Sequence, residues 1–303
     1  MRQQALQMHK YRSNGLMDMV VYILLAFIGI VTLYPFWNIL VLTLNDPVDT
    51  IRGGIYLWPR MFTLNNLKVI FSMEQLARAF GNSVLRTVIG AVFSVASITT
   101  LAYVMSRKDF VFHKTLQRIF IITMYVNGGL IPYYFVIKAL GLRNSFLVYI
   151  IPMLLQPFYI FVTRSYLDGL PGSLQESAKI DGANDLYIFI KIIMPLSKPI
   201  ISTILLFVAV DQWNAWFDTF IFVSDKKLTT LQYELVKILS QSTASIKSYE
   251  DLRSKISGGS SIVTTPESIR MAITVVATLP ILLVYPFVQK YFIHGLTLGA
   301  VKE

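Results

Sequence analysis

The residues that could do chemistry in this chain are polar side chains set inside long apolar stretches. Asp211 and Asp218 both lie in the apolar stretch 199–223, Asp211 nearer its middle and Asp218 near its end. A carboxylate inside a membrane needs a partner or a water-filled surface, so Asp211 marks either an interhelical hydrogen bond or a path for a polar solute. Amides and aromatic rings in these stretches could also line such a path or simply fill the core. The candidates for the path are Tyr125, Asn127, Gln156, Tyr159, Asp211, Trp213, Asn214 and Trp216.

Patterns typical of catalysis or of metal binding are absent from the sequence. The three histidines, His9, His113 and His294, are far apart, and neither His-Glu-x-x-His nor Gly-x-Ser-x-Gly occurs. There is no cysteine, and no glycine-rich phosphate loop ends in Gly-Lys-Ser or Gly-Lys-Thr. The sequence therefore predicts no catalytic, cofactor or metal site in this chain, and any energy that it uses must come from another protein.

The segment 168–198 is too polar in its first half to enter lipid, and it is rich in residues that begin and end helices. Ser173 and Glu176 have the spacing of a capping box, which predicts a helix that begins near Leu174. Gly182 can adopt the left-handed conformation that ends such a helix. The first half of the segment is therefore expected to be one short helix that ends in a glycine turn.

The second half of the segment is expected to be a second short helix. Asn184 or Asp185 can cap its N-terminus, and the piece 186–194 is apolar except for Lys191. Pro195 is expected to end it, because proline lacks the amide donor that a continuing helix needs. An interfacial or re-entrant hairpin that binds no partner would show the same pattern, so the pattern alone leaves partner binding open.

The residue types within this segment follow a specific order and spacing. Glu176-Ser177-Ala178 is followed after three residues by Gly182, and after nine more by Ile192-Ile193-Met194-Pro195. This order resembles the EAA loop of binding-protein-dependent ABC importers, which is read as Glu-Ala-Ala, three residues, Gly, nine residues and Ile-x-Leu-Pro. The departures are Ser177 in place of alanine and Met194 in place of leucine, and Asp181-Gly182-Ala183 agrees with the common form.

The resemblance implies that a separate ATPase binds this loop in the cytoplasm. Glu176 would meet a basic side chain of the ATPase, Ala178 and Gly182 would permit close packing in its cleft, and Asp181 would help to fix the turn. The expected ATPase-coupling residues are Glu176, Ser177, Ala178, Asp181, Gly182 and Pro195. The implied partners are a second homologous permease subunit, two ATPase subunits that hold ATP and magnesium, and an extracytoplasmic solute-binding protein.

The resemblance extends over the chain from about Phe80 to the C-terminus. The long loop before the last apolar stretch, and the final run from Gly295 to Lys302, look like those of the maltose-type carbohydrate permeases. The first apolar stretch and the C-terminal half look most similar to the subgroup that handles complex oligosaccharides and polysaccharide fragments. The implied fold is that of a type I ABC importer permease, and the implied function is inward translocation of a carbohydrate, an oligosaccharide in particular, by alternating access.

The elements that must position these residues are membrane-spanning helices, because 54% of the chain is hydrophobic and only 15% is charged. About 20 apolar residues are needed to cross the hydrocarbon core. An all-α integral membrane protein with six transmembrane helices is predicted, and the stretches that qualify are 19–42, 82–105, 115–140, 144–167, 199–223 and 269–293. The third is expected to be kinked or broken between Asn127 and Pro132. Arg86 in the second is expected to extend to the membrane interface.

Six spans place both termini on one side of the membrane. Basic residues are nearly equal in number on the two sides, but those of the loop 224–268 count for less because long loops cross regardless of charge. With the EAA-like loop in the cytoplasm, the expected order is a cytoplasmic segment 1–18, the first helix and an external loop 19–79, a permease core 80–293 and a cytoplasmic tail 294–303. The core would contain the coupling loop 168–198 and the external loop 224–268, with a flexible run from Ser257 to Ser261.

The expected location is the bacterial cytoplasmic membrane. The net charge of +10 is spread over termini and connections, which favours contact with lipid headgroups over nucleic acid.

Two other classes of protein stay open on the residues alone. A secondary carrier would be expected to show two similar halves with paired broken helices, whereas this sequence indicates one broken span and no evident repeat. A membrane-embedded enzyme would need a catalytic set that the sequence does not offer. Uptake that depends on a proton or sodium gradient without an ATPase would support the carrier.

Overall fold

The computed structural model describes residues 15–244, 265 and 267–283, and the regular elements within these residues are all helices. The α-helices are α1 Gly15–Thr43, α2 Pro47–Ile51, α3 Asn65–Ser72, α4 Glu74–Ser106, α5 His113–Tyr125, α6 Leu130–Ala139, α7 Pro157–Asp168, α8 Ser173–Ile180, α9 Asp185–Ile188, α10 Met194–Leu196, α11 Lys198–Asn214, α12 Phe217–Phe222 and α13 Leu231–Ala244. Short 3-10 helices η1 Phe146–Tyr149 and η2 Ile151–Met153 precede α7, a π-helix η3 Phe189–Ile193 follows α9, and a further helix covers 267–283. The predicted all-α class is confirmed for this part of the chain.

The chain divides into two compact units. The described part of the first unit consists of residues 15–69, 265 and 267–275, and that of the second consists of residues 70–244 and 276–283. The flexible run expected from Ser257 to Ser261, the end of the sixth predicted span and the C-terminal run lie outside the described residues.

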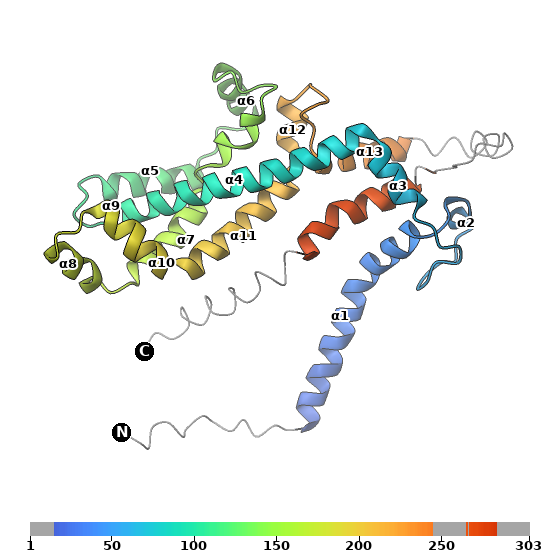
Figure 1. Cartoon of the computed structure of the whole chain (residues 1–303), viewed down its shortest axis with the longest axis horizontal. Helices are drawn as coiled ribbons and strands as arrows, with labels where there is room; N and C mark the ends of the chain where they lie inside the picture. The colour runs from blue at the N-terminus through green and yellow to red at the C-terminus, as the bar shows by residue number, and fades with distance from the viewer. Residues whose placement is uncertain (1–14, 245–264, 266, 284–303) are drawn as a thin grey trace. The chain divides into compact units, whose positions relative to one another are not determined.

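The first unit begins with α1 (Figure 1), in which the residues after Asp18 carry no formal charge. Apart from Gly29, its residues from Leu16 to Trp37 are exposed, so no face of this stretch packs into a protein core. A helix that is hydrophobic all round suits lipid, as predicted for the stretch 19–42.

A compact polar cap follows α1 in the same unit, where the sequence predicted only an external loop. Asp46 accepts hydrogen bonds from the amides of Val48 and Asp49 and so caps α2, and Arg60 pairs with Asp49 at 3.1 Å. The buried amide of Asn66 donates to the carbonyl oxygen of Thr43 at 2.8 Å. Local capping and amide hydrogen bonds therefore give this connection a fixed structure.

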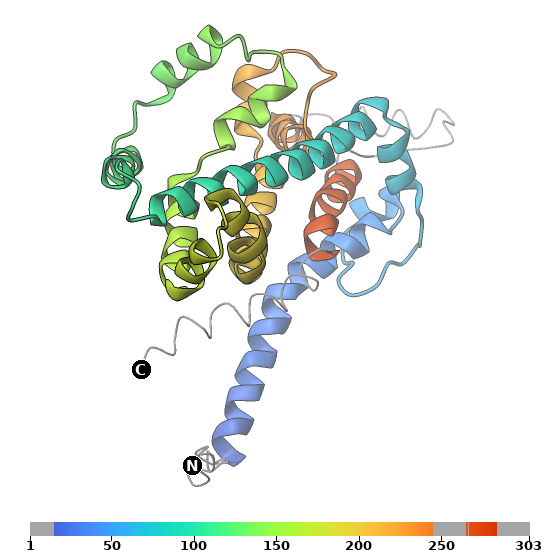
Figure 2. The ribbon, with the colours of Figure 1, turned by 60° about the vertical axis from the view of Figure 1, so that its left-hand side comes forward.

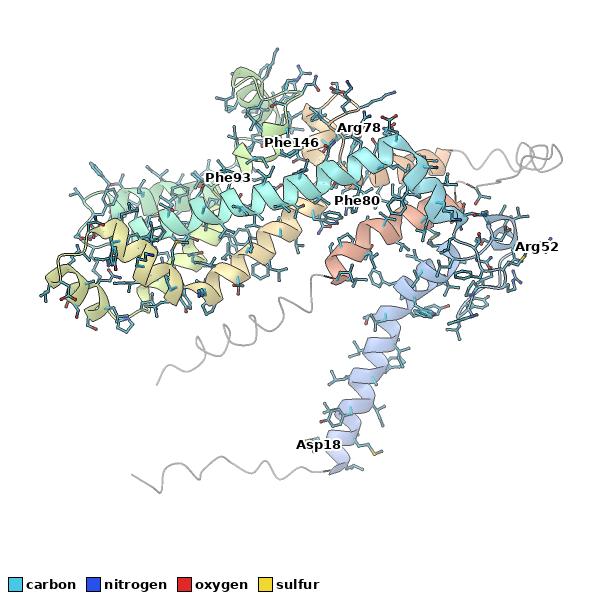
Figure 3. The ribbon with its side chains drawn as sticks, in the orientation of Figure 1. Asp18, Arg52, Arg78, Phe80, Phe93 and Phe146 are labelled. Atoms are coloured by element: carbon cyan, nitrogen blue, oxygen red, sulfur yellow. The ribbon has the colours of Figure 1, made fainter. Side chains whose placement is uncertain are left out.

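The second unit is built on α4, which extends from residue 74, well before the predicted start at 82 (Figures 1 and 2). One face of α4 is buried and carries small residues at helical spacing, among them Ala91, Ser94 and Ala102. Small side chains let neighbouring helices approach closely, which is how helices associate in lipid. The opposite face exposes large apolar side chains such as Phe93 (Figure 3).

The core of this unit joins α4, α7, α11 and the segment α9–α10. Ile98 of α4 and Ile160 of α7 are fully buried, as are Ile204 and Val208 of α11 to within 1%. Ile188 of α9 belongs to the same cluster. The predicted coupling segment is therefore packed into the helix bundle at its second half.

Three of the predicted spans are broken rather than one. The third is split into α5 and α6 at 126–129, as the sequence predicted. The fourth is η1 and η2 followed by α7 at an angle of 45°. The fifth is split into α11 and α12 by an extended residue at Ala215, which the sequence did not predict.

Two described helices, Leu16–Thr43 and Glu74–Ser106, are each long and apolar enough to cross a membrane. The number rises to four if two bent pairs each count as one span. The pairs are Phe146–Met153 with Pro157–Asp168, and Asp185–Leu196 with Lys198–Asn214, bent by 80°. α11 alone has 17 residues, about 25 Å at 1.5 Å per residue, which falls short of the hydrocarbon thickness.

Candidate functional site

The first helix of the segment 168–198 is α8, which begins at Ser173 as expected. The predicted capping box is wrong, because Gly172 occupies the N-cap and no side chain caps the helix. The first amides instead donate to carbonyls of the preceding turn, for example Gln175 to Gly172 at 3.0 Å. Glu176 lies in the first turn, where the positive end of the helix dipole favours a carboxylate.

The turn after α8 has the geometry that the glycine predicted. Gly182 has φ +81°, in the left-handed region. The Ala183 amide donates to the Ala178 carbonyl at 2.9 Å, and the Gly182 amide donates to the Lys179 carbonyl at 3.1 Å. These two bonds form a Schellman motif, which satisfies the last carbonyls of α8. Asp181 is the C-cap residue and is exposed.

The second half of the segment begins as predicted and ends differently. The Asn184 side chain accepts a hydrogen bond from the Tyr187 amide at 2.8 Å and so caps α9. Pro195 does not end the helix, because the chain first widens into the π-helix η3, with the Met194 amide bonded to the Phe189 carbonyl. Pro195 then falls in the first turn of α10, where its missing amide costs little.

The second half of the segment is anchored in the bundle. Ile188 and Ile193 are buried to 0% and 1% exposure in the core shared with α4, α7 and α11. The Phe189 ring stacks on Tyr103 of α4 at 4.8 Å between centroids, and the Tyr166 hydroxyl of α7 donates to the Leu196 carbonyl at 3.1 Å. A displacement of this half must therefore displace α4 and α7.

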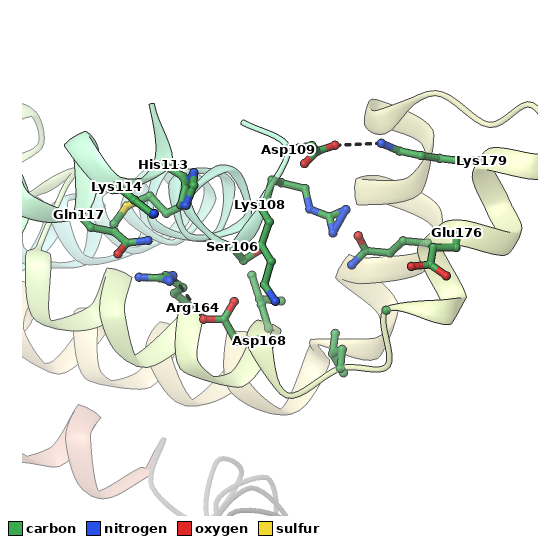
Figure 4. Close-up of a pocket in the computed structure, with 16 residues that line it drawn as sticks. Ser106, Lys108, Asp109, His113, Lys114, Gln117, Arg164, Asp168, Glu176 and Lys179 are labelled. Carbon is green, nitrogen blue, oxygen red and sulfur yellow. Dashed lines mark hydrogen bonds and ion pairs between the residues drawn. The ribbon is translucent and has the colours of Figure 1, made fainter. Parts of the chain in front are cut away.

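In contrast, α8 projects from the bundle. None of its residues is buried, and Ile180 is 85% exposed. Lys179 joins α8 to the α4–α5 connection through Asp109 at 3.1 Å (Figure 4) and to α9 through Asp185 at 3.3 Å. The hydrogen bond from Lys179 is the largest cause that lowers the pKa of Asp109, and the bond to Asp109 is the largest cause that raises the pKa of Lys179.

A cavity of about 1010 Å³ lies between α8, the end of α7 and the α4–α5 connection (Figure 4). Glu176 lines it, together with the ion pair of Arg164 and Asp168 from α7. Of the other expected coupling residues, Ser177, Asp181, Gly182 and Pro195 are exposed and Ala178 is half-buried. The structure thus brings most of these residues to one exposed protrusion, with Pro195 at the opposite, anchored end.

A buried polar cluster that the sequence reading missed connects α4 with α11 and α12. Arg86 is fully buried rather than extended to an interface, so the prediction that it reaches an interface is wrong. Its Nη2 lies 2.6 Å from Asp218 Oδ2, its Nη1 donates to the Ala215 carbonyl at 3.0 Å, and its Nε and Nη2 donate to Gln212 Oε1. The guanidinium also lies 4.4 Å from the centroid of the Tyr149 ring.

A signal for this cluster was present in the sequence. Arg86 falls in one predicted span and Asp218 in another, and opposite charges inside the membrane pair with one another. Each charge also lies near the end of its predicted span, so the sequence agreed equally well with two charges that reach the membrane interface separately.

Among the predicted path residues, Tyr159 and Asp211 are in direct contact. The Tyr159 hydroxyl of α7 donates to Asp211 Oδ2 of α11 at 2.7 Å, and the Tyr159 ring stacks on Phe207. The partner expected for Asp211 is therefore found. Gln156 is the N-cap residue of α7, and Asn214 is exposed three residues after Asp211 on α11.

The other predicted path residues are separate from this pair. Trp213 is a core residue, 5% exposed, and its indole donates to the Ala277 carbonyl at 2.9 Å. Trp216 contacts the Phe217 and Phe220 rings. Tyr125 is 84% exposed at the end of α5, and Asn127 lines a cavity of about 620 Å³ at the α5–α6 break. No hydrogen bond or ring contact within the described residues joins Tyr125 or Asn127 to α11.

Sequence comparisons place the chain among transport proteins. The family described as "Binding-protein-dependent transport system inner membrane component" matches residues 98–298, which is more than half of the chain. The polygalacturonan/rhamnogalacturonan transport system permease protein YtcP of Bacillus subtilis is 35% identical over 290 residues, 96% of this chain and 99% of the relative. Protein LplC of the same organism is 34% identical over 297 residues, 97% of this chain and 98% of the relative.

A solved structure supports the same assignment. It is the crystal structure of a bacterial ABC transporter involved in the import of the acidic polysaccharide alginate, similar with a TM-score of 0.82 and 28% identity over 93% of this chain and 98% of that chain. Together these matches show that this chain belongs to the family of binding-protein-dependent transport system inner membrane components.

Proposed function

We propose that this chain is the membrane-spanning permease subunit of a binding-protein-dependent ABC importer that carries an oligosaccharide inward, with a separate ATPase acting on α8. Support for a carbohydrate comes from the relatives, which include a polygalacturonan/rhamnogalacturonan permease and an importer of alginate. Polygalacturonan and alginate are both acidic polysaccharides, so fragments that carry uronate groups are the first candidates for the cargo.

The observation that carries the mechanism is the contrast between the two halves of the segment 168–198. The second half holds Ile188 and Ile193 in the core, whereas α8 has no buried residue. An amphipathic helix that leaves Ile180 85% exposed suits a groove on a partner protein. Force applied to α8 would reach α4, α7 and α11 through the anchored half, and that is how ATPase closure would open and close the path.

The proposed partners are a second homologous permease, two ATPase subunits that hold ATP and magnesium, and an extracytoplasmic solute-binding protein. This chain would itself be non-catalytic. The proposed topology has six spans, with both termini and the coupling loop 168–198 in the cytoplasm. The segments 43–81 and 224–268 would be external; part of the latter is α13, whose Glu234 accepts a hydrogen bond from Gln75 of α4 at 2.8 Å.

For the substrate path we propose the surface near the Tyr159–Asp211 hydrogen bond, with Gln156 and Asn214 beside it. Tyr159 and Asp211 come from different helices of the bundle, so their contact changes if α7 and α11 move relative to each other. The packed indole of Trp213 is better explained as a structural contact between α11 and the helix 267–283.

The experiment is a pair of matched glycine substitutions in the purified assembly. Gly182 (φ +81°) and Gly141 (φ +68°) both end a helix in a Schellman motif, and a Cβ at either would meet nothing within 4 Å. Valine at either position therefore imposes the same backbone strain, about 1–2 kcal/mol. Gly182→Val is expected to abolish transport and stimulated ATP hydrolysis, whereas Gly141→Val, at the end of α6, keeps both.

A charge reversal tests the ATPase contact directly. Glu176→Lys replaces an exposed carboxylate in the first turn of α8, so folding is expected to be unchanged. Membrane insertion and assembly should persist while binding-protein-stimulated ATP hydrolysis is lost. Normal transport in both Gly182→Val and Glu176→Lys assemblies would show that α8 is not the coupling element.

A further inference from the structure

The cavity beside α8 is lined by more basic than acidic side chains. Five basic residues and three acidic ones line it, from the α4–α5 connection, the start of α5, the end of α7 and α8 (Figure 4). The basic residues are Arg107, Lys108, Lys114, Arg164 and Lys179, and the acidic residues are Asp109, Asp168 and Glu176. At neutral pH the lining carries a net positive charge.

Most of the acidic charge is already used by ion pairs. Asp109 pairs with Lys179 at 3.1 Å, and Asp168 pairs with Arg164 at 3.3 Å. Within the described residues, Arg107, Lys108 and Lys114 form no ion pair. The cavity thus offers three cationic groups to an anionic ligand.

The arginine among them is held in place and has spare donor capacity. The Arg107 guanidinium lies 5.1 Å from the centroid of the Tyr103 ring, which fixes its direction. Its Nε is buried and has no hydrogen-bond partner in the described part of the chain. A planar guanidinium beside flexible ammonium groups is a combination typical of phosphate recognition.

The side chains around the cavity indicate which kind of phosphate compound would bind there. Val111 and Phe112, which lie in the α4–α5 connection between Asp109 and Lys114, are 83% and 61% exposed. α5 continues from this connection and exposes large apolar side chains such as Ile119 and Ile122, at 50% and 57%, so the cavity lies at the end of an apolar helix surface. A free anion needs no apolar neighbours, whereas a phospholipid brings acyl chains that would cover such side chains.

We propose that this cavity binds a phosphate group through Arg107, Lys108 and Lys114, and that the phosphate is the headgroup of an acidic phospholipid. Because Lys179 of α8 lines the same cavity, the bound headgroup lies next to the link between α8 and Asp109. Lipid composition thereby acts on the position of α8. This lipid site is separate from the proposed transport function, and lipid binding to it can be measured without a transport assay.

The test uses the assembled transporter in phosphatidylcholine nanodiscs that contain increasing fractions of spin-labelled phosphatidylglycerol. Protein-bound lipid is read from the immobilised component of the spin-label spectrum. The variant is Lys108→Gln with Lys114→Gln, both at exposed positions, and the matched control is Arg118→Gln, an exposed cation on α5 that does not line the cavity. Each hydrogen bond from a lysine to the bound phosphate contributes about fivefold in affinity, so the double variant should bind about 25-fold more weakly.

The control variant should stay within about twofold of the unmodified protein, because Arg118 does not line the cavity and makes no contact with a headgroup bound there. Equal lipid binding by the double variant and the unmodified protein, or an equal loss in Arg118→Gln, would overturn the proposal. A second arm titrates inorganic phosphate into pure phosphatidylcholine discs by calorimetry. Phosphate binding that requires Lys108 and Lys114, without any phosphatidylglycerol binding, supports the phosphate site and overturns the lipid source.

Discussion

Replacing Asp218 with asparagine tests the buried cluster that holds α11 and α12 against α4. Arg86 is 0% exposed, and Asp218 provides two of its contacts, at 3.2 and 2.6 Å. The other acceptors, the Gln212 side chain and the Ala215 carbonyl, carry no formal charge. Asp218→Asn keeps the shape of the side chain but leaves the guanidinium buried without an anion.

The loss of unfolding free energy in each variant depends on which charge stays buried without its partner. Removing one partner of a buried ion pair costs about 3–5 kcal/mol, because the other charge is left uncompensated. Asp218 is 18% exposed, so water can partly compensate, and we expect about 3 kcal/mol. Arg86→Met should cost less, about 1–2 kcal/mol, because the remaining carboxylate reaches water and still accepts the Thr219 amide.

The measurement is unfolding of the purified chain in mixed detergent micelles, followed by circular dichroism. Glu74→Gln is the matched control, because Glu74 forms an ion pair with Arg78 on the same helix but is 85% exposed. An exposed pair of this kind is worth only about 0.3–0.5 kcal/mol. The expected order of destabilisation is therefore Asp218→Asn, then Arg86→Met, then Glu74→Gln.

The double variant tests whether the destabilisation by Asp218→Asn arises from the charge left on Arg86. If the cost of Asp218→Asn arises from an uncompensated Arg86, then Arg86→Met with Asp218→Asn should be no less stable than Arg86→Met alone. Strict additivity of the two single effects would refute the account, as would a cost for Asp218→Asn no larger than that of Glu74→Gln.

Three further predictions concern α4, the path and the link to α8. Gly90→Ala would place a Cβ 2.5 Å from the Gln212 amide nitrogen and should lower the free energy of unfolding by about 1–3 kcal/mol. Gly81→Ala is the control on the same helix, and it should leave this free energy unchanged because its Cβ would meet nothing within 4 Å. Tyr159→Phe removes the hydrogen bond to the aspartate on α11 and should reduce substrate uptake while stimulated ATP hydrolysis persists; unchanged uptake would exclude the pair from the path. The lowered pKa of Asp109 means that its stabilising contribution is present above its ordinary pKa of 3.8 and is lost only as the pH falls through the lower folded value. Coupled ATP hydrolysis should therefore be weaker in Asp109→Asn to the same extent from roughly pH 6 to 8, and a deficit that changes across that range would contradict this assignment.

Continuous apolar runs made the first two long helices predictable. The stretch 19–42 became α1 and the stretch 82–105 became α4, with ends that differ because contacts outside the apolar run continue the helix. α4 begins eight residues earlier than predicted, and there Gln75 donates to the buried carboxylate of Glu234 on α13. Hydropathy cannot report such a contact between residues that are distant in sequence.

The break between α11 and α12 shows why the remaining features were unpredictable. No proline or glycine lies near Ala215, so the local sequence gives no reason to stop a helix there. The Ala215 carbonyl instead accepts a hydrogen bond from Arg86, and the Thr219 amide donates to the side chain of Asp218. Both bonds replace helical ones, and the first joins residues 129 positions apart.

In the segment 168–198, features that depend on a few neighbouring residues were predictable, and features that depend on packing were not. The left-handed turn at Gly182 and the cap at Asn184 depend on neighbours within five residues, and both were predictable. The effect of Pro195 depended on whether the preceding turn would widen, and that turn carries Ile193 into the shared core. Whether a proline ends a helix therefore depends also on how the apolar residues just before it pack.

These contacts make α11 the connection between the proposed coupling segment and the proposed substrate path. Its N-terminal end follows the corner at Ser197, where the chain bends by 80° from the coupling segment. Near its other end are Asp211, bonded to α7, and Gln212, bonded to Arg86. The helix between them is unbroken for 17 residues, so a rotation imposed at the corner must be transmitted to the Tyr159–Asp211 contact. The Arg86 cluster marks where this rigid length ends, because Arg86 bonds to Gln212 on α11 and to the Ala215 carbonyl at the break.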